Sequence, residues 1–154
     1  MFLWLVCRDK LMTNEEGVRC HFSADARCPS CLHSPKSANH VLHTCPSACS
    51  VWILLIKSDK FDEFLRMDFQ DWIEINLTNP SYFARVSIDW DLMFGAVAWN
   101  LWLDRNAMVF GNEPGVRQSV LTRSLWLTQV GQRADVQTRQ SRRQGLAQPE
   151  NNQI

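Results

Sequence analysis

The chain has 154 residues, of which 45% are hydrophobic, and its 16 basic side chains balance 16 acidic ones. This composition excludes a wholly disordered chain and indicates one modest globular domain. Zero net charge removes the long-range field of a generic polyanion binder, and the longest apolar stretch, residues 92–103, is shorter than the roughly 20 residues that a membrane span needs.

Rare residues and charges are distributed unevenly along the chain. All four His lie between positions 21 and 43. Residues 1–57 carry 6 basic and 4 acidic side chains, residues 58–113 carry 4 and 10, and residues 114–154 carry 6 and 2. We therefore expect three regions, namely a Cys/His-rich domain, a Trp-rich helical connecting region and a polar basic tail.

The N-terminal segment has no export signal. Residues 1–6 are apolar, but no basic segment precedes them and no small-residue cleavage site follows. We expect an intracellular protein, cytoplasmic or nuclear and not secreted. In such a reducing compartment, cysteines serve as thiols or metal ligands more often than as disulfides.

Two short helices are predicted in the first region. Thr13 and Glu16 form a capping box that begins a helix over about 14–21. Pro46 suits a first helical position, and apolar residues at helical spacing extend a second helix to about Lys57.

Apolar periodicity continues downstream and predicts a mainly α-helical fold. Bulky residues mark one helical face over 61–77, and a further helix over about 88–110 is expected to be the most buried element. Residues 116–130 have a marginal helical pattern, while residues 131–154 have few apolar side chains. Because little apolar surface is available to offset chain entropy, we expect the tail over 114–154 to be largely disordered.

A candidate metal site lies between the first two predicted helices, with Cys28, Cys31, His40 and Cys45 as ligands. A Cys-x2-Cys turn directs two thiolates at one ion, and a His and a Cys from the next turn complete a tetrahedron. Four protein ligands leave no position for water. We therefore expect one structural Zn²⁺ in a knuckle of CCHC type, without metal catalysis.

This ligand set has alternatives. His43 is two residues from Cys45 and replaces His40 in one of them, while Cys49 lies one turn into the following helix. We prefer His40, because its four-residue gap to Cys45 leaves the chain room to wrap around the ion. In a metal-free alternative, the cysteines are small buried residues and the histidines lie at the surface.

The motifs around these residues resemble a known family. Phe2-Leu-Trp-Leu5, Cys28-Pro-Ser-Cys31 and Cys45-Pro-Ser-Ala48 are similar to the zinc-binding domain of plant non-LTR retrotransposon reverse transcriptases. Trp99-Asn-Leu-Trp102 with Arg105-Asn106 is similar to the segment that follows this domain in those polyproteins. The resemblance implies a fragment without the polymerase and ribonuclease H domains, and it implies zinc ligands at Cys28, Cys31, His40 and Cys45.

No catalytic motif accompanies this site in the sequence. The chain has no Asp-Asp pair for a polymerase, no Gly-rich phosphate loop and no Gly-x-Ser-x-Gly elbow. The acidic residues between 62 and 74 follow a helical pattern and are interpreted as a solvated face. We expect that the chain is not an enzyme.

The resemblance implies a nucleic-acid-binding module for RNA or single-stranded DNA. Arg19, Arg27 and Lys36 are the candidate phosphate contacts, and so few cations predict weak, salt-sensitive binding without sequence readout. Further basic residues of the tail are interpreted as solvated more readily than as ligands, and these are Arg133, Arg139, Arg142 and Arg143.

A protein-interaction scaffold is the alternative function. In that hypothesis Trp72, Trp90, Trp99 and Trp102 form a helical surface for other domains or for self-association. Core packing is the more ordinary role of such residues. A third possibility is a retroelement remnant without selected activity.

Overall fold

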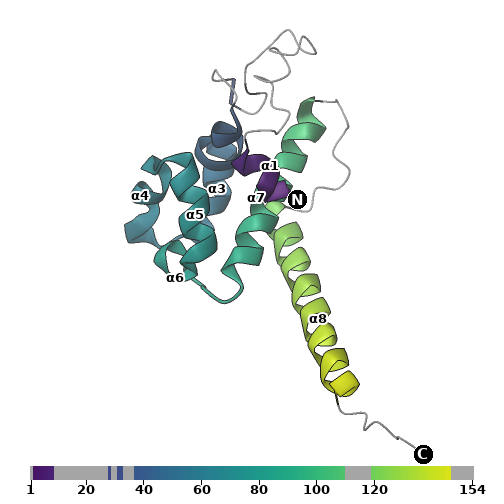
Figure 1. Ribbon diagram of the computed structural model, residues 1–154. Helices are drawn as coiled ribbons and strands as arrows, with labels where there is room; N and C mark the ends of the chain where they lie inside the picture. Colours follow the sequence, from purple (N-terminus) through teal and green to yellow (C-terminus); the bar gives the residue numbers. More distant parts are fainter. Residues whose placement is uncertain (1, 9–27, 29–30, 33–36, 110–118, 147–154) are drawn as a thin grey trace, which may run out of the picture.

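The computed structural model describes residues 2–8, 28, 31–32, 37–109 and 119–146 (Figure 1). Within this part of the chain all regular elements are helices, apart from one isolated antiparallel bridge between Ile56 and Ala84. The expected mainly α-helical fold is thereby confirmed. The helix predicted over 14–21 lies outside the described residues. In chain order the elements are α1 (Phe2–Cys7), η1 (His40–Thr44), α3 (Pro46–Leu55), η2 (Ser58–Lys60), α4 (Phe61–Arg66), α5 (Phe69–Thr78), α6 (Pro80–Phe83), α7 (Trp90–Val109) and α8 (Val120–Leu146).

The predicted helix over 61–77 is divided into α4 and α5. Met67 and Asp68 between them have extended backbone conformations, with ψ of 145° and 142°. The apolar spacing nevertheless continues across this break, so that Phe64 and Trp72 both point into the core. A periodic pattern alone therefore did not reveal the break.

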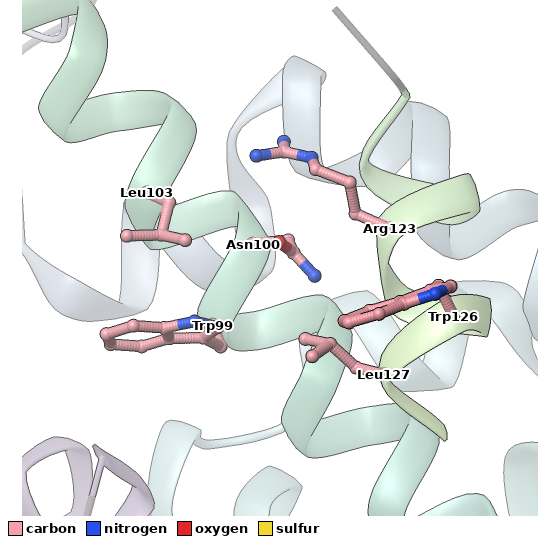
Figure 2. Close-up of a pocket in the computed structure, with 6 residues that line it drawn as sticks. All are labelled: Trp99, Asn100, Leu103, Arg123, Trp126 and Leu127. Atoms are coloured by element: carbon pink, nitrogen blue, oxygen red, sulfur yellow. The ribbon is translucent and has the colours of Figure 1, made fainter. Parts of the chain in front are cut away.

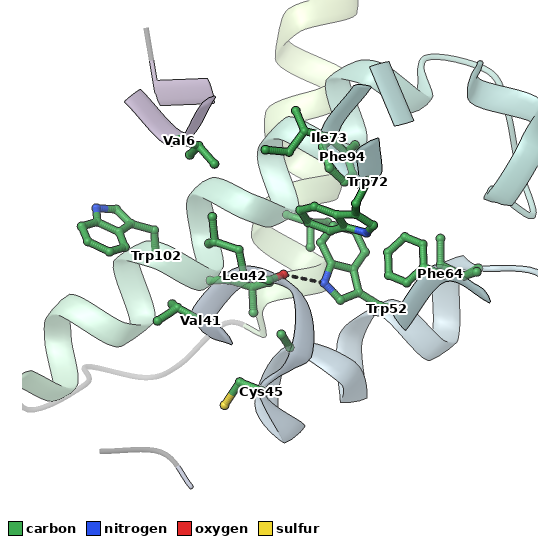
Figure 3. Close-up of a cluster of buried hydrophobic side chains, with 14 of the residues drawn as sticks. Val6, Val41, Leu42, Cys45, Trp52, Phe64, Trp72, Ile73, Phe94 and Trp102 are labelled. Atoms are coloured by element: carbon green, nitrogen blue, oxygen red, sulfur yellow. Dashed lines mark hydrogen bonds between the residues drawn. The ribbon is translucent and has the colours of Figure 1, made fainter. Parts of the chain in front are cut away.

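Aromatic side chains build the centre of the molecule (Figure 3). Trp52 of α3, Phe64 of α4, Trp72 of α5 and Phe94 of α7 are at most 1% exposed. Trp52 and Trp72 each have ring centroids within 6 Å of the other three rings, as in the 4.8 Å contact between Trp72 and Phe94. The indole Nε1 of Trp52 donates a hydrogen bond of 2.8 Å to the carbonyl of Leu42, which satisfies both buried groups.

Helix α7 packs against elements from several parts of the chain. It contacts η1, α5 and α8, and Phe2 of α1 meets its Trp99 edge-on with ring centroids 5.1 Å apart. Because several faces of α7 are covered, its apolar residues do not form a single stripe.

Helix α8 differs from the expected disordered tail. The chain is helical from Val120 to Leu146, and the last eight residues lie outside the described part. Its first half packs on α7, where Asn100 Nδ2 donates 3.1 Å to the buried Ser124 Oγ. The second half extends away from the other helices (Figure 1). Gln, Arg and Leu are favourable helix formers, so a helix started on α7 continues into solvent.

Candidate metal centre

The structure brings the four preferred ligand residues together. The sulfur atoms of Cys28, Cys31 and Cys45 and a ring nitrogen of His40 all lie within 4.8 Å of one another. Cys28 and Cys45 are buried, with 2% and 3% exposure, while Cys31 and His40 are half-buried. Side chains from separate parts of the sequence thus converge at one site beside the aromatic core.

A tight turn positions the first two cysteines. The backbone N–H of Leu32 donates a hydrogen bond of 2.7 Å to the carbonyl of Cys28. Leu32 has a φ of 59°, in the left-handed region that an L-residue other than Asn or Asp rarely adopts. Its side chain is 70% exposed, so apolar burial does not stabilise this conformation. The hydrogen bond from Leu32 to Cys28, which closes the turn, accounts for this left-handed backbone conformation.

A single turn of π-helix positions the other two residues. In η1 the N–H of Cys45 donates 2.7 Å to the carbonyl of His40, five residues earlier. This bond holds the backbones of the two residues next to each other, at the N-terminus of α3. The N–H of His40 in turn donates to Ser37 Oγ at 3.2 Å. Isolated π-turns often occur at functional sites, and no sequence pattern predicted this one.

The spacing of the donor atoms fits zinc. With Zn–S bonds of about 2.3 Å and Zn–N bonds of about 2.0 Å, a tetrahedral site has S···S edges of about 3.8 Å and S···N edges of about 3.5 Å. The Cys28 and Cys45 sulfurs are 3.8 Å apart, and the Cys31 sulfur lies 3.3 Å from His40 Nε2. Three sulfur donors and one imidazole also match the chemical preference of Zn²⁺. The cluster can hold one zinc ion.

The alternative ligand His43 lies elsewhere, in the aromatic core. It is fully buried, its Nε2 donates 2.6 Å to the carbonyl of Phe64, and its Nδ1 lies 2.9 Å from Oδ1 of Asn39. Burial lowers the pKa of His43, and the hydrogen bond to Phe64 opposes part of that shift. Both ring nitrogens therefore face groups outside the cluster.

Cys49 also lies apart from the four clustered residues. Its thiol faces the carbonyl of Thr44 at 3.6 Å and that of His43 at 3.8 Å. Burial raises the pKa of the Cys49 thiol above its ordinary value, and the nearby Cys45 adds to the shift. A thiol in this position is a weak hydrogen-bond donor to the helix backbone.

The other predicted site residues have different outcomes. Arg19, Arg27 and Lys36 lie outside the described residues. The acidic side chains that were interpreted as a solvated face are all exposed, and these are Asp62, Glu63, Asp68, Asp71 and Glu74. No helix in the described part of the chain is both long enough and apolar enough to cross a bilayer.

The tryptophans divide between core and surface. Trp72, Trp90 and Trp102 are 1–8% exposed and pack in the core. Trp99 is 39% exposed, and together with Trp126, which is 62% exposed, it borders a cavity of about 470 Å³ between α7 and α8 (Figure 2). Trp126 was not predicted as a surface residue, because the helical pattern over residues 116–130 is only marginal.

Fold and site together define a small helical module with one zinc-binding cluster. Residues 1–52 match the family described as zinc-binding in reverse transcriptase. Over these residues the chain is therefore similar to the zinc-binding domain of reverse transcriptases, as the resemblance implied.

A longer relative extends the comparison beyond this domain. A putative ribonuclease H protein of Arabidopsis thaliana is 30% identical over 129 residues, which is 84% of this chain. The chain spans 20% of the length of that relative. No solved structure matches the chain.

Proposed function

We propose that Cys28, Cys31, His40 and Cys45 hold one structural zinc ion in a noncatalytic module. The observation that carries this proposal is the convergence of three sulfur atoms and one imidazole nitrogen within 4.8 Å. A site filled by four protein ligands has no open position for a substrate or for an activated water molecule. Zinc bound there contributes to folding, since the cluster joins the Cys28–Leu32 turn to η1 and α3.

We further propose that this module binds single-stranded nucleic acid through its phosphates. Arg27 directly precedes the ligand Cys28, and Lys36 directly precedes Ser37, which caps the His40 backbone. These two cations therefore lie next to residues of the metal site in the sequence. The name of the plant relative denotes a ribonuclease, a class of protein that acts on RNA, and this supports RNA as the ligand.

Salt-dependent titration of a fluorescent single-stranded RNA tests this proposal. A matching DNA strand is the comparison. If Arg19, Arg27 and Lys36 contact three phosphates, their joint replacement by Ala reduces the slope of log K against log salt by about 2. Joint replacement of Arg139, Arg142 and Arg143 by Ala is the charge-matched control and leaves binding nearly unchanged. Absence of binding by the unaltered chain at low salt would overturn the proposal, and so would a larger loss in the control.

An interaction scaffold is the second candidate function, and the cavity in Figure 2 favours it. Trp126 is largely exposed, and Leu103 and Leu127 line the same cavity. Exposed aromatic rings next to a cavity are typical of protein–protein interfaces. Sedimentation velocity tests for self-association: the scaffold hypothesis predicts a dimer at high concentration that Trp126→Arg converts to monomer. A monomer at all concentrations argues against self-association.

A further inference from the structure

The second half of α8 is a basic helix that is exposed on all sides. Residues 133–145 are all exposed, and this segment, here called the α8 extension, runs away from the other helices (Figure 1). Its charged residues are Arg133, Asp135, Arg139, Arg142 and Arg143. Arg139 pairs with Asp135 at 2.9 Å, whereas Arg142 and Arg143 form no ion pair with any residue that the structure describes. The extension therefore presents an excess of positive charge to solvent.

An excess of negative charge lies on α4 and α5. Asp68, Asp71 and Glu74 recur every three residues, so they share one side of α5 at its start, and all three are exposed. Asp62 adds an exposed carboxylate in the first turn of α4. Within the described ranges, none of these four carboxylates forms an ion pair. The four residues together are here called the acidic face.

The α8 extension and the acidic face are complementary, but they do not meet within one chain. The extension points away from α4 and α5 (Figure 1). The whole chain has zero net charge, with 10 acidic and 4 basic residues over 58–113. At about 1.5 Å per residue, residues 139–143 span about 6 Å of helix and residues 68–74 about 9 Å, so the two charged surfaces are similar in length. A second copy of the chain supplies the surface that each of them lacks.

We propose that the chain forms a two-fold dimer in which the α8 extension of each copy lies on the acidic face of the other. This inference deepens the scaffold hypothesis, on which it rests, and does not depend on the zinc site. Reciprocal contacts close the assembly at two copies, because each chain offers one surface of each sign. Exposed ion pairs contribute little individually, so the dimer is weak and sensitive to salt. The contact is separate from the cavity in Figure 2, since none of these residues lines that cavity.

Charge reversal tests the proposal, with sedimentation velocity of the full chain at low salt as the measurement. One variant reverses the extension and carries Arg139→Glu, Arg142→Glu and Arg143→Glu. The other reverses the acidic face and carries Asp68→Lys, Asp71→Lys and Glu74→Lys. Each variant alone is expected to be a monomer at concentrations where the unaltered chain is a dimer, because its two surfaces then have charges of the same sign. A mixture of the two variants is expected to dimerise, since each surface again meets one of opposite charge.

Salt and a pair of single variants provide the controls. An increase from about 0.05 M to about 0.5 M salt is expected to weaken the dimer of the unaltered chain about tenfold, a test that needs no substitution. Asp71→Lys is expected to weaken the dimer, and Asp91→Lys is expected to leave it unchanged. Asp91 is exposed in the first turn of α7, as Asp71 is in the first turn of α5, but it lies outside the acidic face.

Several results would overturn this interface. These are a dimer that persists in either reversed variant, a mixture that remains monomeric, and a dimer that salt does not weaken. A dimer that is lost in Trp126→Arg and kept in both reversed variants would assign self-association to the cavity in Figure 2. Loss of RNA binding in the variant with the reversed extension, without any dimer, would assign the extension to nucleic acid. A monomeric unaltered chain at low salt would refute self-association altogether, whereas the results at the reversed surfaces refute this interface alone.

Discussion

The imidazole of His43 stacks on the indole of Trp72, with ring centroids 4.3 Å apart and an angle of 19° between the planes. This contact places one histidine of the Cys/His-rich segment in the aromatic core, while His40, three residues earlier, lies in the metal cluster. Two residues of the same type in one helical turn thus have separate roles. The separation has direct consequences for mutagenesis.

His43→Ala is expected to destabilise the zinc-bound protein by about 3 kcal/mol without a loss of zinc per folded chain. The substitution removes a buried ring and leaves the carbonyl of Phe64 without its donor. Urea unfolding gives the free energy, and elemental analysis of the folded fraction gives the zinc content. Zinc loss in folded His43→Ala would contradict this assignment of the two histidines.

Trp52→Phe is expected to lower the free energy of unfolding by about 2 kcal/mol. The Phe ring cannot donate to the Leu42 carbonyl, and it fills less of the fully buried site. Trp126→Phe is the matched control: its ring is 62% exposed, and the change is expected to stay within about 0.5 kcal/mol. Similar losses in the two variants, measured by urea unfolding, would contradict the position of the core.

Leu32→Gly is expected to stabilise the zinc-bound protein by about 0.5 kcal/mol. Glycine removes the penalty of a left-handed backbone, and this gain exceeds the entropy of the more flexible unfolded chain. The same substitution at Leu54 is the control, because Leu54 is similarly exposed but lies within α3. There glycine is expected to destabilise by about 1 kcal/mol. If Leu32→Gly and Leu54→Gly shift the midpoint of thermal unfolding in the same direction, the result would argue against backbone strain at Leu32.

Hydrogen exchange is expected to divide α8 into two parts. Residues 120–132 pack on α7, and Gln132 Nε2 donates 2.6 Å to Oδ2 of Asp89, the residue just before that helix. Their amides should therefore exchange slowly. Residues 133–145 are exposed on all sides, so their amides should exchange much faster. Mass spectrometry of peptides from the full chain measures this difference. Equally fast exchange in both parts would mean that α7 does not hold α8.

The helices that the sequence predicted best are those with a local start signal. Pro46 marked the beginning of α3, and the apolar run near residue 90 marked α7. The break at Met67 and Asp68 was missed because it preserves the apolar spacing on both sides. The length of α8 was missed because helix propensity and packing on α7 extend it where apolar periodicity has ended.

The candidate site could be predicted in part because zinc ligands follow short spacings. The Cys-x2-Cys turn and the gap from His40 to Cys45 are local features, and the structure brings these residues together. The π-turn of η1 has no sequence signature.

Native mass spectrometry of the full chain, purified under reducing conditions with zinc supplied, tests the metal site most directly. The account predicts one zinc ion per chain, which is lost in Cys28→Ser and in His40→Ala and kept in Cys49→Ser. Cys49 is the matched control because its thiol faces backbone carbonyls outside the cluster. A zinc-free unaltered chain, or zinc retained in both ligand variants, would contradict the assignment of Cys28, Cys31, His40 and Cys45 as the zinc site.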